Sequence, residues 1–277
     1  MSHSLALAIV TLLAAFVNGA LGYGFSSITV PIALLFLSNR VLNPALVLVE
    51  VALNSYVILT NLAAVPVVFR RVLPVLVGLL PGVIGGTIIV SQVSPGWLKL
   101  ATYIVLLPLI LVQAAGWRRP IRAERAAGLI FGGGLGVLYS VTTISGPPLA
   151  VALNNQGFSK QEFRAALGLI RLAESGMTAI AYLAAGLFTA ASLALVPGIL
   201  PSVLIGVPIG AFVIRHVPSE TFRRVCMSFD AWIVAFGIST LLRELHVIDG
   251  YAAYSLMAVV IAVDAWLLYR FFAPRSG

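Results

Sequence analysis

Two apolar stretches interrupted by glycine and proline lie at matching places in the two halves of the chain, at residues 19–31 and 132–148. A helix broken inside a membrane turns backbone N–H groups and the dipoles of its half-helices toward a ligand. When such breaks occur at corresponding positions of an internal repeat, they indicate a substrate site near the middle of the bilayer. The pattern therefore predicts a membrane transporter built from two halves.

The chain is too apolar for the surface of a soluble protein, since 60% of its residues are hydrophobic and only 9% are charged. We therefore expect an all-α polytopic membrane protein. The net charge of +8 arises from basic residues in short loops between apolar spans. That placement is typical of a topology signal, and no basic patch of the kind that binds nucleic acid is present.

Enzymatic and metal chemistry are not expected from this sequence. The single cysteine excludes an intrachain disulfide, and the three histidines have no metal-ligand spacing. The predicted spans contain no recognisable pairing of a nucleophile with a base. We expect a protein that is not an enzyme and that has no metal and no cofactor.

Uninterrupted windows long and apolar enough to cross a bilayer account for most of the remaining sequence. They lie at residues 41–66, 72–91, 97–116, 161–185, 190–214, 220–242 and 251–272. The interrupted stretch at 5–38 would be about 50 Å long as one straight helix, well beyond the ~30 Å hydrocarbon core. It must therefore fold back on itself.

The distribution of Arg and Lys indicates how the second interrupted stretch, at 126–153, is placed. If it returns to the side on which it starts, one face of the membrane receives only Arg40, Lys99 and Arg243, and the opposite face receives the other basic loop residues. The positive-inside rule favours this arrangement over an even split. It predicts a multi-pass inner-membrane protein with a periplasmic N-terminus, a cytoplasmic loop at 117–125 and a cytoplasmic C-terminus.

Each half then consists of a broken re-entrant helical hairpin and three transmembrane helices. Because each half makes an odd number of net crossings, the two repeats are inverted relative to each other. The expected divisions are a first repeat at 1–116, a connecting loop at 117–125, a second repeat at 126–242, and an extra helix with a tail at 243–277. A GxxxG pattern beginning at Gly82 recurs at Gly206, and we interpret both as close helix packing.

Three sequence features together resemble a known family. They are Gly22-Tyr23-Gly24-Phe25 followed by Pro31, Ser145-Gly146-Pro147-Pro148-Leu149, and the repeated glycine helices at Gly82 and Gly206. With the two-half layout they give the chain, over essentially its whole length, a resemblance to the sulfite exporter TauE/SafE family of bacterial anion transporters. Ser26 and Ser27 stand where members of that family often carry further glycines. The resemblance implies export or uptake of a small sulfur-containing or organic anion, such as sulfite or a sulfonate.

Arg171 lies ten residues after the start of the predicted span at 161, too deep for its guanidinium to reach the interface easily. A buried arginine needs an anionic partner or a watery cavity. One interpretation is that Arg171 binds the substrate. The other is an ion pair with Glu174, three residues later, or with Glu50 in the first half. Even a paired carboxylate could be displaced by an anion or, when protonated, carry a coupling proton.

Neutral hydrogen-bond donors gather at both breaks, and such donors suit an oxyanion that must be bound and then released. Each Ser or Thr has the alternative of bonding a carbonyl of its own helix, and Asn54 has the alternative of an interhelical hydrogen bond. The predicted substrate-binding residues are Gly22, Tyr23, Gly24, Ser26, Ser27, Asn54, Tyr139, Thr142, Thr143, Ser145, Gly146 and Arg171. The predicted coupling or ion-pair residues are Glu50 and Glu174.

Two further acidic residues, Asp230 and Asp264, lie at or near membrane depth. Asp230 is a candidate proton site. Asp264 belongs to the extra span and is a candidate for pairing with a neighbouring helix or for an oligomer contact.

The function expected from these features is secondary transport of a small anion by alternating access around the two breaks, in the direction of export. An anion-selective channel and a membrane protein without a transport role are the alternatives. A channel would show a continuous polar face, whereas the polar residues concentrate near the breaks. The expected partners are the anion and the lipid bilayer, with nucleic acid excluded and a homodimer as an option.

Overall fold

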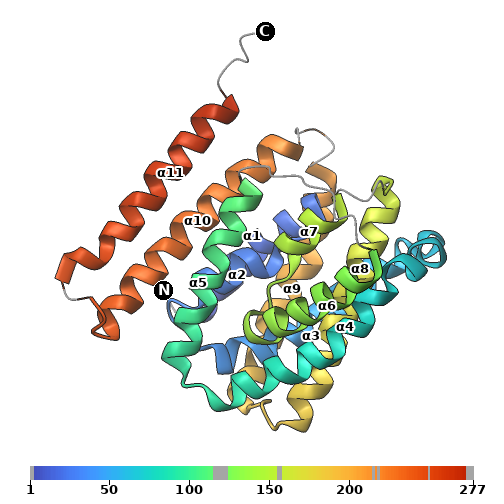
Figure 1. Ribbon diagram of the computed structural model, residues 1–277, viewed down its shortest axis with the longest axis horizontal. Coiled ribbons are helices and arrows are strands. Elements are labelled where there is room, and N and C mark those ends of the chain that lie inside the picture. Colours follow the sequence, from blue (N-terminus) through green and yellow to red (C-terminus); the bar gives the residue numbers. More distant parts are fainter. Residues whose placement is uncertain are drawn as a thin grey trace.

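The computed structural model describes residues 3–114, 124–154, 158–213, 216, 219–248 and 250–272, and within them every regular element is a helix (Figure 1). This confirms the all-α expectation for the described part of the chain. The predicted connecting loop at 117–125 falls outside the described residues except for its last two, where a helix has already begun.

The two halves carry the same succession of elements. The first half contains α1 (His3–Leu21), α2 (Phe25–Ala33), α3 (Asn39–Leu59), the short 3₁₀ helix η1 (Leu62–Ala64), α4 (Val65–Gln92) and α5 (Pro95–Ala114). The second half contains α6 (Glu124–Thr142), α7 (Gly146–Asn154), α8 (Lys160–Ala184), α9 (Ala190–Val213) and α10 (Ser219–Glu244). A short 3₁₀ helix η2 (Gly250–Tyr254) and α11 (Ser255–Phe272) follow.

Both interrupted stretches are broken helices, as predicted. Residues 22–24 separate α1 from α2, and Gly22 and Gly24 adopt φ angles of 85° and 109°. Residues with a Cβ rarely occupy this left-handed region, so glycine is what allows α1 to end and α2 to begin within three residues. Residues 143–145 separate α6 from α7, and here Thr143 takes a positive φ of 57°.

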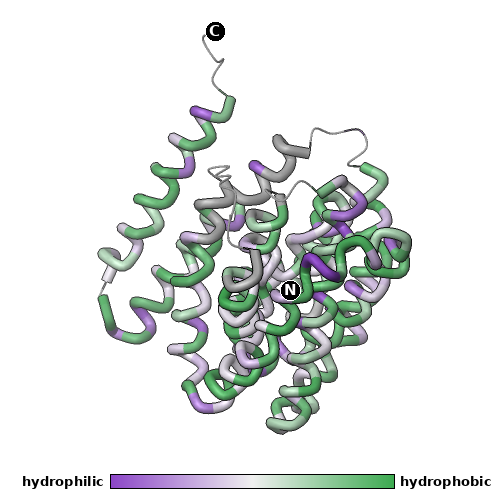
Figure 2. Tube along the Cα trace, turned by 45° about the vertical axis from the view of Figure 1, so that its right-hand side comes forward, coloured by the Kyte–Doolittle hydropathy of each residue, from purple (hydrophilic) through white to green (hydrophobic). Residues whose placement is uncertain are grey.

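Helices long and apolar enough to cross a membrane make up much of the molecule. Among the described residues there are 5 of them, which lie in α3, in η1 with α4, in α8, in α9 and in η2 with α11. Figure 2 shows hydrophobic residues running along these helices. On α9 the outward side chains Leu204, Ile205 and Phe212 are exposed, as lipid-facing residues are. The helices α5 and α10 coincide with the remaining predicted spans at 97–116 and 220–242.

The boundary between the second and third helices differs from the sequence expectation. The sequence predicts one span at 41–66 and another at 72–91, whereas α3 ends at Leu59 and α4 begins at Val65. Pro66 explains the early start, because proline is favoured in the first turn of a helix, where its missing N–H has no partner to lose. Arg70 and Arg71 therefore lie inside α4 and not in a loop.

Close contacts between helices cross from one half of the chain to the other. Helix α4 packs against α6, and α1 packs against α9. A Cβ added at Gly82 would overlap the carbonyl oxygen of Gly133, and one added at Gly210 would overlap that of Phe16. The glycines thus let two pairs of backbones approach closely, as small residues do in membrane helix packing.

Helices α3 and α8 pack against each other, and each also packs against a glycine-bearing helix, α3 against α9 and α8 against α4. Helix α5 packs against α10. Helix α11 packs against α10 and η2 and lies at the edge of the molecule (Figure 1). The polar residues considered next lie where α3 and α8 approach the two breaks.

Candidate functional site

Helix α8 carries two of the predicted site residues on one face. Its start is fixed by a capping box, in which Ser159 Oγ accepts from the Glu162 N–H at 3.3 Å and Glu162 Oε2 accepts from the Ser159 N–H at 2.8 Å. From this start the helix runs unbroken through Arg171 and Glu174. Residues three apart are neighbours on a helix surface, so both side chains point toward the same side.

Arg171 forms a buried ion pair with Glu50 of α3. The Arg171 Nη2 donates to Glu50 Oε1 at 2.8 Å, and both side chains are almost fully excluded from solvent. The sequence left two possible ion-pair partners for Arg171, Glu50 and Glu174, and the structure shows the pair with Glu50. A buried ion pair gains stability when the remaining donors and acceptors of its members are also satisfied.

Glu50 meets that condition. Ser26 Oγ, at the start of α2, donates to Glu50 Oε1, and the Tyr139 hydroxyl of α6 donates to Oε2 at 2.7 Å. With Arg171 this gives the carboxylate three donors from three different helices. The hydrogen bonds from Ser26 and Tyr139 and the ion pair with Arg171 together engage both oxygens of the Glu50 side chain.

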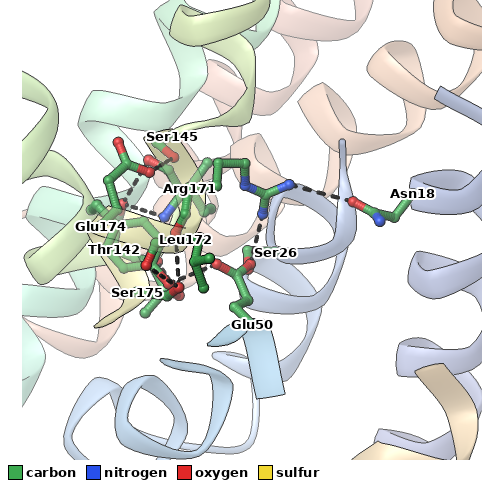
Figure 3. A network of polar contacts seen from close by, with 12 residues as sticks. Asn18, Ser26, Glu50, Thr142, Ser145, Arg171, Leu172, Glu174 and Ser175 are labelled. Carbon is green, nitrogen blue, oxygen red and sulfur yellow. Dashed lines mark hydrogen bonds and ion pairs between the residues drawn. The ribbon is translucent and has the colours of Figure 1, made fainter. Parts of the chain in front are cut away.

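Asn18 joins the same network from α1, one turn before the first break. Its Oδ1 accepts from Arg171 Nη1 at 3.4 Å, and Figure 3 shows the guanidinium between Asn18 and Glu50. Sequence reasoning missed this residue. An amide side chain in an otherwise apolar helix, four residues before Gly22, is the signal that could have found it.

Glu174 has fewer hydrogen-bond partners among the described residues than Glu50 has. Its Oε2 accepts a hydrogen bond from Ser145 Oγ, immediately before α7, while its Oε1 is buried without a hydrogen-bond partner among the described residues. Arg171 Nε is likewise buried and unpartnered in the described structure. A buried acceptor, Glu174 Oε1, and a buried donor, Arg171 Nε, thus lie on one helix face without hydrogen-bond partners. A ligand or a water molecule beside them would satisfy both atoms.

The two breaks approach each other at this site. A Cβ added at Gly146 would lie 3.3 Å from Tyr23 Cβ, and α2 contacts α7. A serine close to each break also donates to a carboxyl group of the long helix that follows the broken pair, Ser26 to Glu50 of α3 and Ser145 to Glu174 of α8. Gly22, Tyr23 and Gly24 thus form the first break, and Gly146, which begins α7 directly after Ser145, lies against Tyr23.

Several predicted hydroxyls serve their own backbone. Thr142 Oγ1 donates to the Leu138 carbonyl at 2.7 Å and accepts from the Ile144 N–H at 3.0 Å, which closes the end of α6. Thr143 Oγ1 donates to the Thr142 carbonyl at 2.7 Å. These are the local roles that the sequence offered as alternatives.

Two other predicted residues are buried and lie close along the chain to members of the network. Among the described residues, neither forms a hydrogen bond with the network. Ser27 lies next to Ser26 on α2. Asn54 lies one turn after Glu50 on α3, and its Nδ2 has no partner in the described part of the chain.

A second buried ion pair joins the last two helices. Arg224 Nη2 of α10 donates to Asp264 Oδ1 of α11 at 3.2 Å, and Ser228 Oγ and Trp232 Nε1 add hydrogen bonds at 3.1 Å. Of the roles considered for Asp264, the structure shows pairing with a neighbouring helix. Asp230 is buried in α10, and its Oδ2 has no partner among the described residues.

Comparison with known proteins adds one match. The model of the family described as Sulfite exporter TauE/SafE matches residues 7–237, which include every residue of the Arg171 network. Comparison with curated proteins and comparison with solved structures gave no match. Among the described residues, no three His, Cys, Asp or Glu side chains gather as a metal site would require.

Proposed function

The chain belongs to the sulfite exporter TauE/SafE family, and from this premise we propose that it is a secondary transporter of a small sulfur-containing or organic anion. It acts in the bacterial inner membrane by alternating access and in the direction of export. The apolar helices and the membership of a transporter family make it an integral membrane protein. The anion binds at Arg171.

The observation that carries the proposal is the placement of Arg171. Its guanidinium is buried between Asn18 of α1 and Glu50 of α3, and its Nε has no partner among the described residues. A guanidinium presents a planar set of donors that matches an oxyanion, and Glu50 occupies only the Nη2 side of it. The long hydrogen bond to Asn18, at 3.4 Å, is one that an incoming oxyanion can replace.

Neutral groups around Arg171 suit reversible binding. Ser145 and Tyr139 bring hydroxyls from the second break and from α6, where each already contacts a carboxylate of the network. Hydroxyls rotate and can donate to an anion without adding a permanent charge. Glu50 limits the net positive charge, so the anion is held firmly enough to be selected and loosely enough to leave.

The packing of the helices supports the proposal that the two halves are repeats of each other, and the odd number of crossings proposed for each half would make them inverted. Exchanging each helix of the first half for its counterpart in the second turns the α1–α9 contact into the α6–α4 contact. The same exchange turns α3–α9 into α8–α4, and α2–α10 into α7–α5, and all of these contacts are present. A site between two such halves allows access to alternate as they rock against each other.

The positions of basic residues support the proposed orientation. Arg71 lies over the ring of Phe158, 4.2 Å from its centroid, so the first turns of α4 adjoin the segment that leads into α8. Arg40 Nη2 donates to the Ser91 carbonyl at 3.0 Å, at the other end of α4, which is about 42 Å long. Arg71 and Arg40 thus lie toward opposite ends of a helix long enough to cross the membrane, which supports their placement on opposite sides.

A thermal-shift screen tests the proposed function. Purified protein is heated with sulfite, thiosulfate, sulfate, methanesulfonate or acetate, each against sodium chloride at equal ionic strength. A bound anion stabilises by RT ln(1 + [L]/Kd), about 2.7 kcal/mol at a hundredfold excess over Kd. We expect stabilisation by at least one sulfur oxyanion, and its loss in Arg171→Lys.

Arg224→Lys is the matched control, because Arg224 is also buried and ion-paired but belongs to the α10–α11 contact. This variant should melt at a lower temperature and keep the anion-dependent shift. Absence of stabilisation by every anion, or an unchanged shift in Arg171→Lys, would contradict the proposed site.

A further inference from the structure

The buried network contains more acidic groups than basic ones. Its charged or titratable side chains are Arg171 and Glu174 of α8, Glu50 of α3 and Tyr139 of α6. Among the described residues, α4 and α7 contribute no charged side chain to it. One cation therefore faces two carboxyl groups that are buried from the surface.

The two carboxyl groups are not equivalent. Glu50 receives Arg171, Tyr139 and Ser26, whereas Glu174 receives one hydroxyl, from Ser145, and has a buried oxygen with no partner among the described residues. An ionised carboxylate buried without a cation of its own is strongly unfavourable. A proton on Glu174 Oε1 removes that charge and leaves the hydrogen bond from Ser145 to Oε2 intact.

We propose that Glu174 is the proton-binding residue of the transporter and that the anion and this proton bind together. The inference rests on the proposed function, since it requires the anion to bind at Arg171. The unpaired Arg171 Nε lies on the same helix face as Glu174. An anion placed there would be repelled by an ionised Glu174 and tolerated by a neutral one.

Binding free energies are reciprocal, so an anion that binds better to the protonated site must also increase the affinity of that site for the proton. A monovalent anion and one proton then enter the site as a neutral pair. Because Glu50 already compensates Arg171, the site has the same net charge of −1 when it is empty with Glu174 ionised and when it holds the anion and the proton. The transported pair is itself neutral, so its transport is driven by the concentrations of anion and proton and does not respond to the membrane potential.

Calorimetric titration with methanesulfonate and with thiosulfate tests this proposal, because both probes stay ionised from about pH 6 to about pH 9. For wild-type protein we expect the Kd to rise toward about tenfold per pH unit at the alkaline end. Titration in two buffers of different ionisation enthalpy counts protons directly. We expect uptake approaching about one proton per anion at that end.

Variants assign the proton to Glu174. Glu174→Gln mimics the neutral carboxyl, so its Kd should be independent of pH and binding should take up no proton. Glu162→Gln is the matched control, because Glu162 lies on the same helix near the surface and glutamine preserves its capping box. It should behave as wild type. Ser145→Ala removes the hydroxyl that donates to Glu174 and should move the rise in Kd to higher pH.

Each contrary outcome identifies what fails. Anion binding by wild-type protein with a constant Kd and no proton uptake would overturn the coupling while leaving the anion site intact. A pH dependence that persists in Glu174→Gln would assign the proton to another group. If Glu174→Gln does not fold, an unmoved pH profile in Ser145→Ala would likewise assign the proton elsewhere. No binding of either probe at any pH would overturn the anion site and this inference with it.

Discussion

The behaviour of Arg171 depends on the groups that share its buried environment. Removing one member of a buried ion pair leaves an uncompensated charge and typically costs about 3–5 kcal/mol, whereas replacing both members with neutral groups is often tolerated. Glu50 and Arg171 are such a pair, with further hydrogen bonds from Ser26 and Tyr139 to Glu50 and from Arg171 to Asn18. Structural and functional roles of Arg171 can therefore be separated by mutating the pair.

Glu50→Gln alone should lower the free energy of unfolding by about 3–5 kcal/mol, because it leaves Arg171 charged and unpaired. The double variant Glu50→Gln/Arg171→Met should recover much of that stability and still fail to bind the anion. Chemical denaturation in detergent measures the first effect, and anion-dependent thermal shift measures the second. Full anion affinity in the double variant would mean that Arg171 only neutralises Glu50.

The sequence indicated Arg171, Glu50 and Glu174 because charged residues in apolar spans stand out. The sequence could not show whether Arg171 pairs with Glu174 or with Glu50. Glu174 lies three residues later on the same helix, Glu50 lies on another helix, and the helical pattern of one segment allows either pair. The packing of α3 against α8 decides for Glu50. Asn18 was missed because a single uncharged amide is common in membrane helices.

Glycines let the helices approach one another closely, but the space around the glycines differs from one position to the next on the same helix. On α4, a Cβ at Gly82 would overlap the backbone of Gly133, whereas a Cβ at Gly85 would meet nothing within 4 Å. The GxxxG pattern predicted close packing at Gly82 and Gly206, and the structure places both against a neighbouring backbone. The break positions were predictable for a similar reason, because glycine and proline mark where a helix cannot continue.

Gly82→Val should reduce the yield of folded protein severely, because α4 and α6 can no longer approach. Gly85→Val is a matched control on the same helix, where the added side chain has room. Monodisperse yield in detergent distinguishes the two variants. Equal yields would show that the glycine contact between α4 and α6 contributes little.

Gly24 and Gly146 differ in backbone conformation, which changes what can be tested at the breaks. Any side chain at Gly24 is strained by its φ of 109°, so a variant there affects folding as well as binding. Gly146 has no such constraint, and its added Cβ would press on Tyr23 at 3.3 Å. Gly146→Ala therefore tests, without strain from a positive φ, whether the contact between the two breaks contributes to the site.

For the molecule as a whole, the succession of helices in each half and the extra helix at the end were predictable from hydropathy. The boundary between α3 and α4 was misplaced, because apolar sequence continues through the turn at residues 60–64 and only Pro66 marks the new helix. The sequence could not predict which helices pack against each other, because a hydropathy pattern describes one helix at a time. The contacts α1–α9 and α4–α6 join the two halves.

Cysteine labelling tests the proposed orientation in a Cys226→Ser background. A cysteine at Ser94, in the exposed turn between α4 and α5, should react with an impermeant thiol reagent added outside intact cells. A cysteine at Gln161, exposed at the start of α8, should react only after the membrane is opened. The reverse pattern would invert the topology, and outside labelling at both positions would contradict the return of the second broken stretch to its starting side.

Anion flux through reconstituted protein links the Arg171 site to transport. Proteoliposomes loaded with radiolabelled sulfite should release it faster than protein-free liposomes when they contain wild-type protein. Proteoliposomes with an equal amount of folded Arg171→Lys should release it at least about tenfold more slowly than wild type, since an ammonium cannot reproduce the paired donors of a guanidinium. Equal release by wild type and Arg171→Lys would contradict an anion path through Arg171.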